Sequence, residues 1–517
     1  MSSRRVQMVY SSLQVESDKV KIMLDLKPAL DGYAGIPQET RLLFLGLRTI
    51  NNYEVEGFIQ HGSRKIRSAI APTGKALSIS KRINRLSRVV VSLYQNPYSS
   101  LFDKVINGVQ SYFALSFLQL RLLSRRSLKP TIFESVLFDD FVWRTFFSKT
   151  LRPVDKALVT SARYRILQAP RKLLHQAGLA GLKFSSTPQY ASVNTTGFDI
   201  FLAQTPFPGR VSRSTQMVVR YHDAVPVLMP HTINDKAFHQ ASHFYALQEN
   251  VRAGAWFACV SEATRSDLVK IFPEVEPRTS VIHNIVSDEY FDEESPKGLI
   301  FQIIPNRMAK VSEFVTNLSG LRVEDKKVRR REFDYLLMVS TLEPRKNHQL
   351  LMAAWERLKF TSMPELKLII VGNKGWDYGP ILDSIRPWAE RGDVFYLNNV
   401  PSSELRVLYK HAAATVCPSF SEGFDYAGVE AMSSGGIVIS SDIPVHREIY
   451  KNASAYFNPY SAEDAALAIR QVLAEDRILI RRRLHEEART VSGLYTSQNI
   501  LPQWNEFFQM LKQLRMS

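Results

Sequence analysis

The chain has 517 residues, of which 45% are apolar and 22% charged, and this composition excludes a disordered chain. A single compact core stops growing at roughly 250–300 residues, so the length predicts two domains of comparable size. The net charge of +16 favours a polyanionic partner, and the two cysteines are too few for a disulfide framework.

The positive charge is concentrated in one segment. Between Arg64 and Lys183 there are 22 Lys and Arg against five acids, so the rest of the chain is close to neutral. This concentration favours an anionic bilayer or a nucleic acid as partner. A basic surface that is merely solvated is the alternative.

No stretch of the sequence predicts a membrane span, which needs roughly 18 uninterrupted apolar residues. The nearest candidate, Tyr112–Leu123, is short and carries Arg121. The first residues also lack the apolar core of a secretory signal. We therefore expect a cytoplasmic protein, and the basic segment adds the expectation of a peripheral position on the inner face of the membrane.

The first predicted unit follows a tail of residues 1–19. Lys21–Leu26 is an apolar run typical of a buried strand, Gly35 lies in the loop after it, and a helix is predicted from about Gln38. A strand, a glycine-bearing loop and a helix form the opening unit of a parallel sheet. Helix N-termini in such a sheet face a ligand crevice.

Residues 60–190 interrupt this alternation. They are basic and mostly helical in pattern, and we interpret them as an elaboration of a first domain that covers residues 20–315. Ser261 is predicted to cap a helix. Apolar runs that indicate further strands of this domain begin the segments Phe198–Gln204, Thr215–Pro230, Ala255–Pro273 and Thr279–Val286.

A charge-dense bridge, residues 316–333, is the predicted linker, and a regular alternation of strands and helices follows it over residues 334–490. The predicted strands are Tyr335–Thr341, Leu366–Gly372, Val394–Val400, Ala413–Ser419 and Gly436–Asp442. Continuous apolar strands separated by helices indicate a parallel sheet covered on both faces. The predicted fold is therefore α/β, with two Rossmann-like parallel-sheet domains facing a cleft. Residues 491–517 are predicted to form a helix that packs back on the first domain.

Polar residues gather where these strands end. Arg345 and Lys346 lie at the junction of a loop and a helix, with Asn347 placed to cap that helix. Two cations beside a helix N-terminus form an anion site, although an isolated Arg-Lys pair is more often a solvated surface pair. Gly372 belongs to a glycine turn that permits close backbone approach.

The stretch SEGFDYAGVEAMSSGG places Glu422 and Glu430 around a helix predicted to begin near Ala427. A pure anion site would not contain two carboxylates. A ligand with both hydroxyls and phosphates would need them, because carboxylates accept hydrogen bonds from hydroxyls while N–H groups, Arg and Lys hold phosphate. A nucleotide diphosphate sugar has this make-up, so we interpret the stretch as its binding loop.

Several segments carry a family resemblance. VSTLEPRKNHQLL, IIVGNKGW, SEGFDYAGVEAMSSGG and SDIPVHREI resemble the successive signatures of family 4 retaining glycosyltransferases, which have the GT-B fold. VVRYHDAVPVLMP and FACVSEATRSDLVKIFP are similar to segments of the mannosyltransferase-like members. The resemblance covers about residues 198–470 and, more faintly, residues 20–47.

The resemblance implies a role for each candidate residue. Arg345 and Lys346 would hold the donor diphosphate and stabilise it as it leaves, and Glu422, the third catalytic residue, would contact the transferred sugar. Glu430 would bind the ribose hydroxyls. The remaining expected substrate-binding residues are Gly35 and Gly372 in loops, His222 on the sugar side unless it is a core histidine, and Gly423, Phe424, Asp425 and Tyr426 around sugar and phosphates.

This sequence departs from the family pattern inside the binding loop. Asp425, Tyr426 and Ala427 stand where Gly, an aliphatic residue and Pro are commoner, and Ser340 replaces a frequent glycine. Asp425 adds a carboxylate close to the sugar pocket. The identity of the donor sugar therefore does not follow from the resemblance.

The resemblance implies transfer of a hexose, mannose or a related sugar, from a nucleotide diphosphate sugar such as GDP-mannose. The acceptor would be a growing surface glycan or a lipid-linked glycan, for example of lipopolysaccharide. No metal or other cofactor is expected, because the basic pair can do a metal's electrostatic work. An anionic membrane is an expected partner and nucleic acid is not. The alternative is a non-catalytic scaffold or nucleic-acid-binding protein of the same fold, with aromatic residues interleaved among basic ones as in Lys81–Tyr98.

Overall fold

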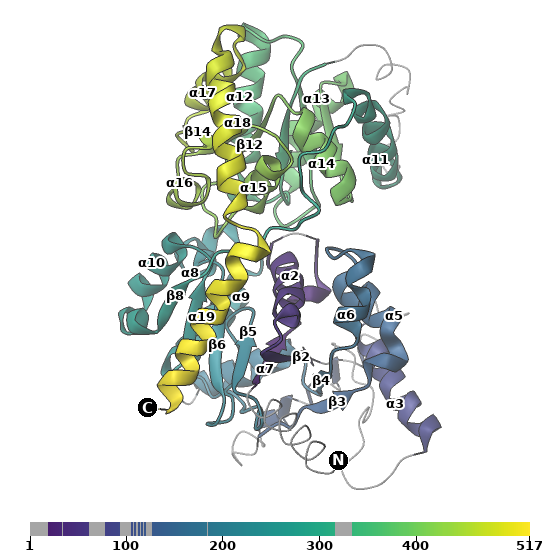
Figure 1. The fold of residues 1–517 in the computed structure, drawn as a ribbon, viewed down its shortest axis with the longest axis vertical. Coiled ribbons are helices and arrows are strands. Elements are labelled where there is room, and N and C mark those ends of the chain that lie inside the picture. Colours follow the sequence, from purple (N-terminus) through teal and green to yellow (C-terminus); the bar gives the residue numbers. More distant parts are fainter. Residues whose placement is uncertain are drawn as a thin grey trace, which may run out of the picture.

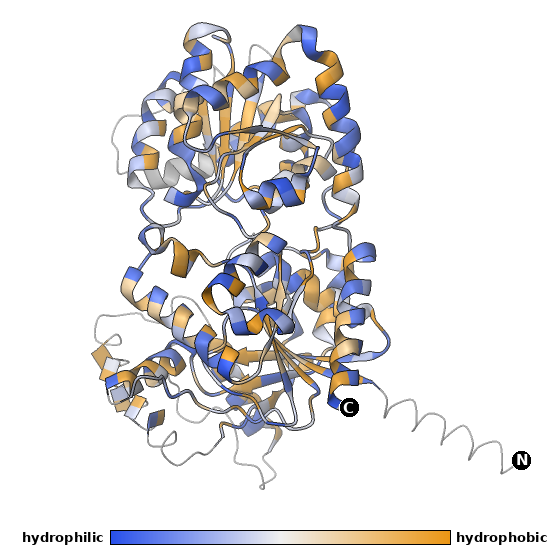
Figure 2. Cartoon of the chain, turned by 90° about the vertical axis from the view of Figure 1, so that its left-hand side faces the viewer, coloured by the Kyte–Doolittle hydropathy of each residue, from blue (hydrophilic) through white to orange (hydrophobic). Residues whose placement is uncertain are grey.

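The computed structural model describes residues 19–60 except 34, 78–93, isolated positions within 105–119, 127–315 except 184, and 333–516. They form two α/β domains, one above the other in Figure 1. Apolar strands lie inside each domain, and the helices around them carry both hydrophilic and hydrophobic residues (Figure 2). The predicted fold class is confirmed. In this described part of the chain, no helix is both long enough and apolar enough to cross a membrane.

The first domain is built on an eight-stranded sheet with the strand order β3-β4-β2-β1-β5-β6-β7-β8. Neighbouring strands pair in parallel except β3 and β4. The bounds are β1 Val20–Asp25, β2 Tyr53–Gln60, β3 Thr131–Phe133, β4 Tyr164–Leu167, β5 Ile200–Ala203, β6 Gln216–Tyr221, β7 Trp256–Cys259 and β8 Thr279–Val281.

Helices predominate among the described residues of 60–190, as predicted, and the structure adds two short strands, β3 and β4, that were not predicted. β4 pairs with β2 in parallel, so the elaboration returns to the sheet from which it leaves. Tyr164 and Ile166 are fully buried, whereas Arg165 reaches Glu56 at 2.7 Å nearer the surface. This alternation over only four residues is too short to stand out in the sequence. Residues 61–77 and 94–104 of the basic segment lie outside the described residues.

Helices cover the first sheet and place its loops. The loop after β1 leads into α2 through Gly35, whose φ of 70° is in the left-handed region that favours glycine. Ser261 caps α10 as predicted, since its hydroxyl accepts a hydrogen bond from the Thr264 amide at 3.1 Å. The helix bounds are α2 Ile36–Thr49, α3 Ile79–Ser92, α5 Asp139–Val142, α6 Lys156–Thr160, α7 Arg171–Ala180, α8 Val225–Leu228, α9 Lys236–Arg252 and α10 Glu262–Ile271.

The second domain is built on a six-stranded parallel sheet with the order β11-β10-β9-β12-β13-β14. The five strands predicted from apolar runs are all present, each somewhat shorter than predicted. β14 was not predicted, because its four residues include a serine and lie between polar turns. The bounds are β9 Tyr335–Val339, β10 Lys367–Val371, β11 Val394–Leu397, β12 Ala414–Cys417, β13 Val438–Ser441 and β14 Ser454–Phe457.

The chain enters the second domain before the predicted linker. Ile300 and Ile304, which were placed in the first domain, are buried in the core of the second beside Tyr335. Of the predicted linker, only residue 333 is described. The helices that follow β8 are α11 Ile300–Val315, α12 His348–Thr361, α13 Gly379–Arg391, α14 Ser402–His411, α15 Tyr426–Ser433, α16 Pro444–Tyr450, α17 Ala462–Leu473, α18 Ile478–Gly493 and α19 Ser497–Met516.

The last helix, α19, lies on the first domain, so the chain crosses between the domains twice (Figure 1). Trp504 and Phe508 are fully buried in the first domain's core. The indole ring of Trp504 also lies 5.1 Å from the guanidinium of Arg220. The two crossing segments touch, because the amide of Val286 donates a hydrogen bond to the carbonyl of Tyr495 at 2.9 Å.

Candidate active site between the domains

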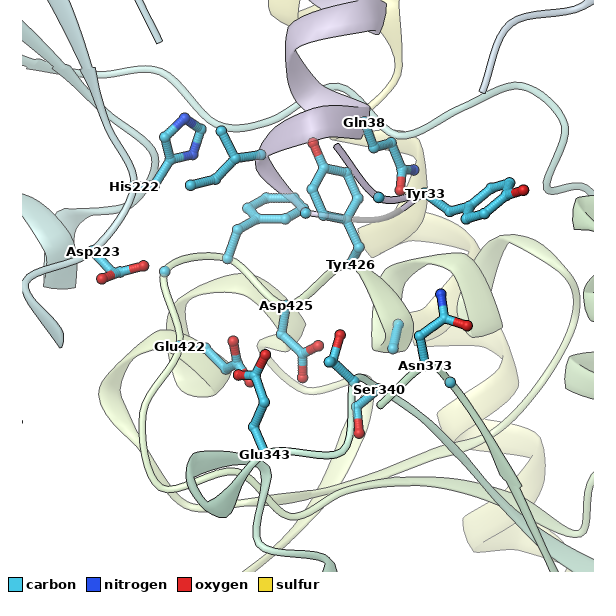
Figure 3. A pocket seen from close by; sticks show the side chains of 18 of the residues that line it. Tyr33, Gln38, His222, Asp223, Ser340, Glu343, Asn373, Glu422, Asp425 and Tyr426 are labelled. Atoms are coloured by element: carbon cyan, nitrogen blue, oxygen red, sulfur yellow. The ribbon is translucent and has the colours of Figure 1, made fainter. Parts of the chain in front are cut away.

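A cavity of about 920 Å³ lies between the domains and is lined by both. Figure 3 shows Tyr33, Gln38, His222 and Asp223 of the first domain, with residues of the second domain opposite them. Every residue predicted for the site lies on the wall of this cavity, namely Gly35, His222, Arg345, Lys346, Gly372, Glu422, Gly423, Phe424, Asp425, Tyr426 and Glu430. The structure thus brings the candidates together, while their roles toward a ligand stay predictions.

The cation pair lies in a 3-10 turn, Pro344–Lys346, between β9 and α12. Both cations bind one carboxylate: Arg345 Nη1 lies 2.8 Å from Glu422 Oε2, and Lys346 Nζ lies 2.6 Å from Glu422 Oε1. Burial raises the pKa of Glu422, but the two cations outweigh burial and the net pKa is lowered. Glu422 is therefore ionised, and the three side chains together carry one positive charge.

The predicted helix cap is wrong. Asn347 lies at the start of α12 with a φ of 60°, but its side chain makes no capping hydrogen bond. Its amide instead donates to the carbonyls of Pro418 at 3.0 Å and Pro459 at 2.9 Å. These bonds fasten the turn that carries the cation pair to the loops after β12 and β14, which lie beside it only in the folded domain.

Two glycines of the site are required by packing. A Cβ on Gly372 would lie 1.8 Å from the carbonyl oxygen of Ser340, and one on Gly423 would lie 1.9 Å from that of His222. The close backbone approach predicted for Gly372 is thus an approach to Ser340. Because His222 belongs to the first domain, Gly423 allows the binding loop to touch the opposite wall of the cavity.

The loop after β12 ends in α15, which begins at Tyr426, one residue earlier than predicted. On this helix, Glu430 accepts hydrogen bonds from Gln38 of α2 at 2.9 Å and from the hydroxyl of Tyr409 at 3.2 Å. Burial raises the pKa of Glu430 to about 7 despite these bonds. The residue expected to bind ribose is therefore held, in this structure, by a side chain of the other domain.

A second contact joins the same two helices. The hydroxyl of Tyr426 donates to Glu39 of α2 at 2.9 Å, and Glu39 is paired with Arg220 at 3.0 Å. Both charged side chains are fully buried. Sequence analysis missed Gln38 and Glu39, because helical periodicity does not distinguish a polar residue that faces another domain from one that faces solvent.

The first-domain wall of the cavity is rich in uncharged imidazoles. Burial lowers the pKa of His175, His222 and His243 to about 3 in each case. Within the described structure, one ring nitrogen of each has no hydrogen-bond partner. Arg171, on the same wall, is occupied by Asp25 at 2.7 Å, so its charge is neutralised within the domain.

Two further acids line the second-domain wall. Burial raises the pKa of Glu343 to about 7. Asp425 is bound by His446 of α16, with 3.0 Å between Asp425 Oδ2 and His446 Nε2. Sequence analysis assigned no role to His446, although it lies within SDIPVHREI. Among the described residues, no cluster of three or more His, Cys, Asp and Glu could hold a metal ion.

Part of the chain matches a known protein family. Residues 322–491 match the family model described as Glycosyl transferases group 1, so this part of the chain is a glycosyltransferase domain of that group. It contains the cation pair, Glu422, Glu430 and the Asp425–His446 contact.

Curated relatives match over part of their length. The chain is 32% identical over 142 residues to O-antigen chain mannosyltransferase B of Escherichia coli, which covers 28% of this chain and 37% of that protein. It is 46% identical over 84 residues to the GDP-mannose:cellobiosyl-diphosphopolyprenol alpha-mannosyltransferase of Xanthomonas oryzae pv. oryzae. This match covers 16% of this chain and 22% of that protein. Each match thus spans less than half of the relative.

The whole fold has a solved counterpart. Sucrose-phosphate synthase from Thermosynechococcus elongatus superposes with a TM-score of 0.54 at 13% identity, covering 96% of this chain and 100% of that chain. At this identity the likeness concerns the fold alone.

Proposed function

We propose that this protein is a retaining glycosyltransferase that moves a hexose from a nucleotide diphosphate sugar to a growing glycan or a lipid-linked acceptor. The observation that carries the proposal is the buried arrangement of Arg345, Lys346 and Glu422 beside the start of α15, within a glycosyltransferase domain. The names of the relatives, which include O-antigen chain mannosyltransferase and GDP-mannose, support mannose as the sugar and GDP as its carrier.

Donor binding follows from charge and from the N-terminus of α15. The excess positive charge of the cation pair and the unpaired amides of the first turn of this eight-residue helix both attract a diphosphate. Glu430, four residues into the helix, is placed to accept hydrogen bonds from ribose hydroxyls. The ribose hydroxyls would then donate to the Glu430 oxygens that accept hydrogen bonds from Gln38 and Tyr409 in this structure.

The transfer step needs stabilisation of a leaving group. As the bond between the anomeric carbon and the phosphate oxygen breaks, negative charge grows on that oxygen, where Arg345 and Lys346 stabilise it. The acceptor hydroxyl attacks from the same face and gives its proton to the leaving phosphate, so the anomeric configuration is retained. Glu422 accepts a hydrogen bond from the sugar and holds it in place.

A panel of nucleotide sugars tests this function. The purified protein is incubated with GDP-mannose, GDP-fucose, UDP-glucose and UDP-galactose, with and without a mannose-terminated acceptor, and release of nucleoside diphosphate is followed. We expect release from one of these donors and an α-linked product by NMR. A protein that binds and consumes none of them would contradict the proposal, and an inverted product would contradict its retaining mechanism.

We further propose that the reaction needs no metal ion, because the two cations supply the positive charge at the leaving group. Treatment with EDTA followed by removal of the chelate should then leave the transfer rate within about twofold of the untreated protein. Loss of activity that added Mg²⁺ or Mn²⁺ restores would contradict this proposal.

We also propose that the basic segment Arg64–Lys183 docks on an anionic membrane. In its described part, Lys81 and Arg82 of α3 are exposed and Ile79 beside them is 69% exposed. Each such cation contributes about 1 kcal/mol near an anionic surface, and salt screens it. Sedimentation with anionic vesicles at low salt, and not at high salt or with neutral vesicles, is the expected result. Recovery in the supernatant throughout, or binding to nucleic acid instead, would contradict the proposal.

A further inference from the structure

Asp425 lines the cavity, and its partner His446 lies behind it. Asp425 immediately precedes α15 with a φ of 60°, and its side chain does not cap the helix. Its carboxylate lies among Glu422, Glu343 and Ser340 on the second-domain wall (Figure 3). The side chain of His446 is fully buried beneath it.

The donors and acceptors around His446 determine the net charge of the Asp425–His446 pair. His446 Nδ1 lies 2.9 Å from the carbonyl oxygen of Ser441 and 3.1 Å from its hydroxyl, which donates its own proton to the Ser419 carbonyl at 2.6 Å. Both neighbours can therefore only accept, so Nδ1 carries a proton. The contact between His446 Nε2 and Asp425 Oδ2 then requires a second proton, on the ring or on the carboxyl. In either case the pair has no net charge.

A neutral pair suits a site that must bind a diphosphate. Glu422 already places one negative charge on this wall and engages both cations. A second, uncompensated carboxylate at Asp425 would repel the phosphates and reduce the benefit of the cation pair. The bond to His446 removes this repulsion and leaves the carboxylate oxygens with unused acceptor capacity, since a carboxylate can accept about four hydrogen bonds.

We propose that Asp425 accepts a hydrogen bond from the transferred sugar and selects an uncharged hexose, and that His446 is the positioning residue that orients and neutralises it. The inference rests on the proposed function and refines it. A uronic acid would bring a third carboxylate toward Glu422 and Asp425 and is rejected. A neutral sugar offers hydroxyl groups that both carboxylates can accept.

The test separates charge from structure with three variants, His446→Gln, Asp425→Asn and the double variant. Binding of GDP, UDP and the nucleosides guanosine and uridine is measured by calorimetry, and kcat/KM is measured for the donor that the wild type uses. The matched control is His411→Gln, which removes another hydrogen-bonded histidine of the second domain, one that contacts Ser295 and does not line the cavity.

We expect His446→Gln to weaken binding of the nucleoside diphosphate roughly tenfold, because Asp425 then loses the hydrogen-bonded partner that offsets its charge and draws instead on Lys346, which also pairs with Glu422. Binding of the nucleoside should change less than twofold, since it has no phosphates. The double variant should regain the affinity for the diphosphate but keep a low kcat/KM, because its side chain at 425 is no longer an anionic acceptor. Asp425→Asn alone should lower the ratio of kcat/KM for the neutral hexose donor to kcat/KM for the matching uronic acid donor.

Unchanged diphosphate binding in His446→Gln, or a double variant that binds no better than His446→Gln, would overturn the role of His446. If His446→Gln does not fold, the inference is tested with Asp425→Asn. It is overturned if this variant has the same kcat/KM and the same sugar preference as the wild type. A wild-type protein that transfers no sugar at all would instead show that the proposed function is wrong. If the wild type does transfer sugar and the three variants have the same diphosphate binding and kcat/KM as His411→Gln, this inference is refuted and the proposed function is not.

Discussion

The two walls of the cavity differ in the groups that they present to a ligand. The second-domain wall contains charged side chains paired with one another, as in Arg345–Glu422 and Lys346–Glu422. The first-domain wall also has an ion pair, Arg171–Asp25, but it adds neutral imidazoles such as those of His175 and His243, each with one ring nitrogen that has no hydrogen-bond partner in the described structure. One wall is thus preorganised to stabilise a developing charge, and the other offers hydrogen bonds to a ligand without charge. This division fits a charged donor and a hydroxyl-bearing acceptor.

The largest expected effect comes from removing the cation pair. Arg345→Ala and Lys346→Ala should each raise the barrier for transfer by about 2–4 kcal/mol, on the scale of other preorganised electrostatic groups. Initial rates at saturating donor measure this effect. Arg447→Ala, which removes an exposed cation paired with Asp442, is the control and should leave the rate unchanged. If the variant that lacks both cations kept near-normal turnover, the proposal that they stabilise the leaving group would be contradicted.

The two glutamates of the binding loop should separate kinetically. We expect Glu422→Gln to lower kcat about ten- to a hundredfold, because the residue contacts the sugar and orients both cations. We expect Glu430→Gln chiefly to raise the Kd of the nucleotide, with a smaller change in kcat. Steady-state kinetics and calorimetry together measure both effects. Interchanged signatures would contradict the roles given to the two residues.

The raised pKa of Glu430 predicts a pH-dependent stability difference. Its folded pKa of about 7 exceeds its usual value of 4.5, so the folded state holds this proton more tightly than the unfolded chain does. Wild-type stability should therefore fall as the pH rises from about 4.5 to 7, and Glu430→Gln should lack this part of the fall. Denaturant titrations without nucleotide should show that the free energy of unfolding of the variant, relative to that of the wild type, is about 2–3 kcal/mol higher at pH 8 than at pH 5. A difference that is the same at both pH values would show that Glu430 does not titrate in this range.

The smallest expected effect tests the neutral wall. His243→Gln should change the KM for the acceptor a few-fold, about the value of one hydrogen bond, and leave the Kd of the nucleotide unchanged. A change in nucleotide affinity without a change in acceptor KM would place His243 on the donor side. The melting temperature of the variant shows whether the fold is intact.

The sequence predicted the second domain well, because its strands are continuous apolar runs with the polar residues at their ends. Contacts between segments that are distant in the chain could not be predicted from the sequence. Asn347 has the residue type of a helix cap, but carbonyls more than 70 residues away take its side chain. β4 is too short to identify without its partner β2, and Gln38 and His446 acquire their roles only when the domains and loops meet.

The double crossing of the chain has a mechanical consequence. Two domains joined by one strand of polypeptide can swing and twist about many axes, and a ligand that bridges them must then immobilise this motion at an entropic cost. Here the segments that cross after β8 and before α19 lie side by side and are bonded through Val286 and Tyr495. A second crossing that is bonded to the first restricts how far one domain can twist relative to the other. Part of the orientational freedom of the two walls is therefore lost when the chain folds rather than when a ligand binds between them.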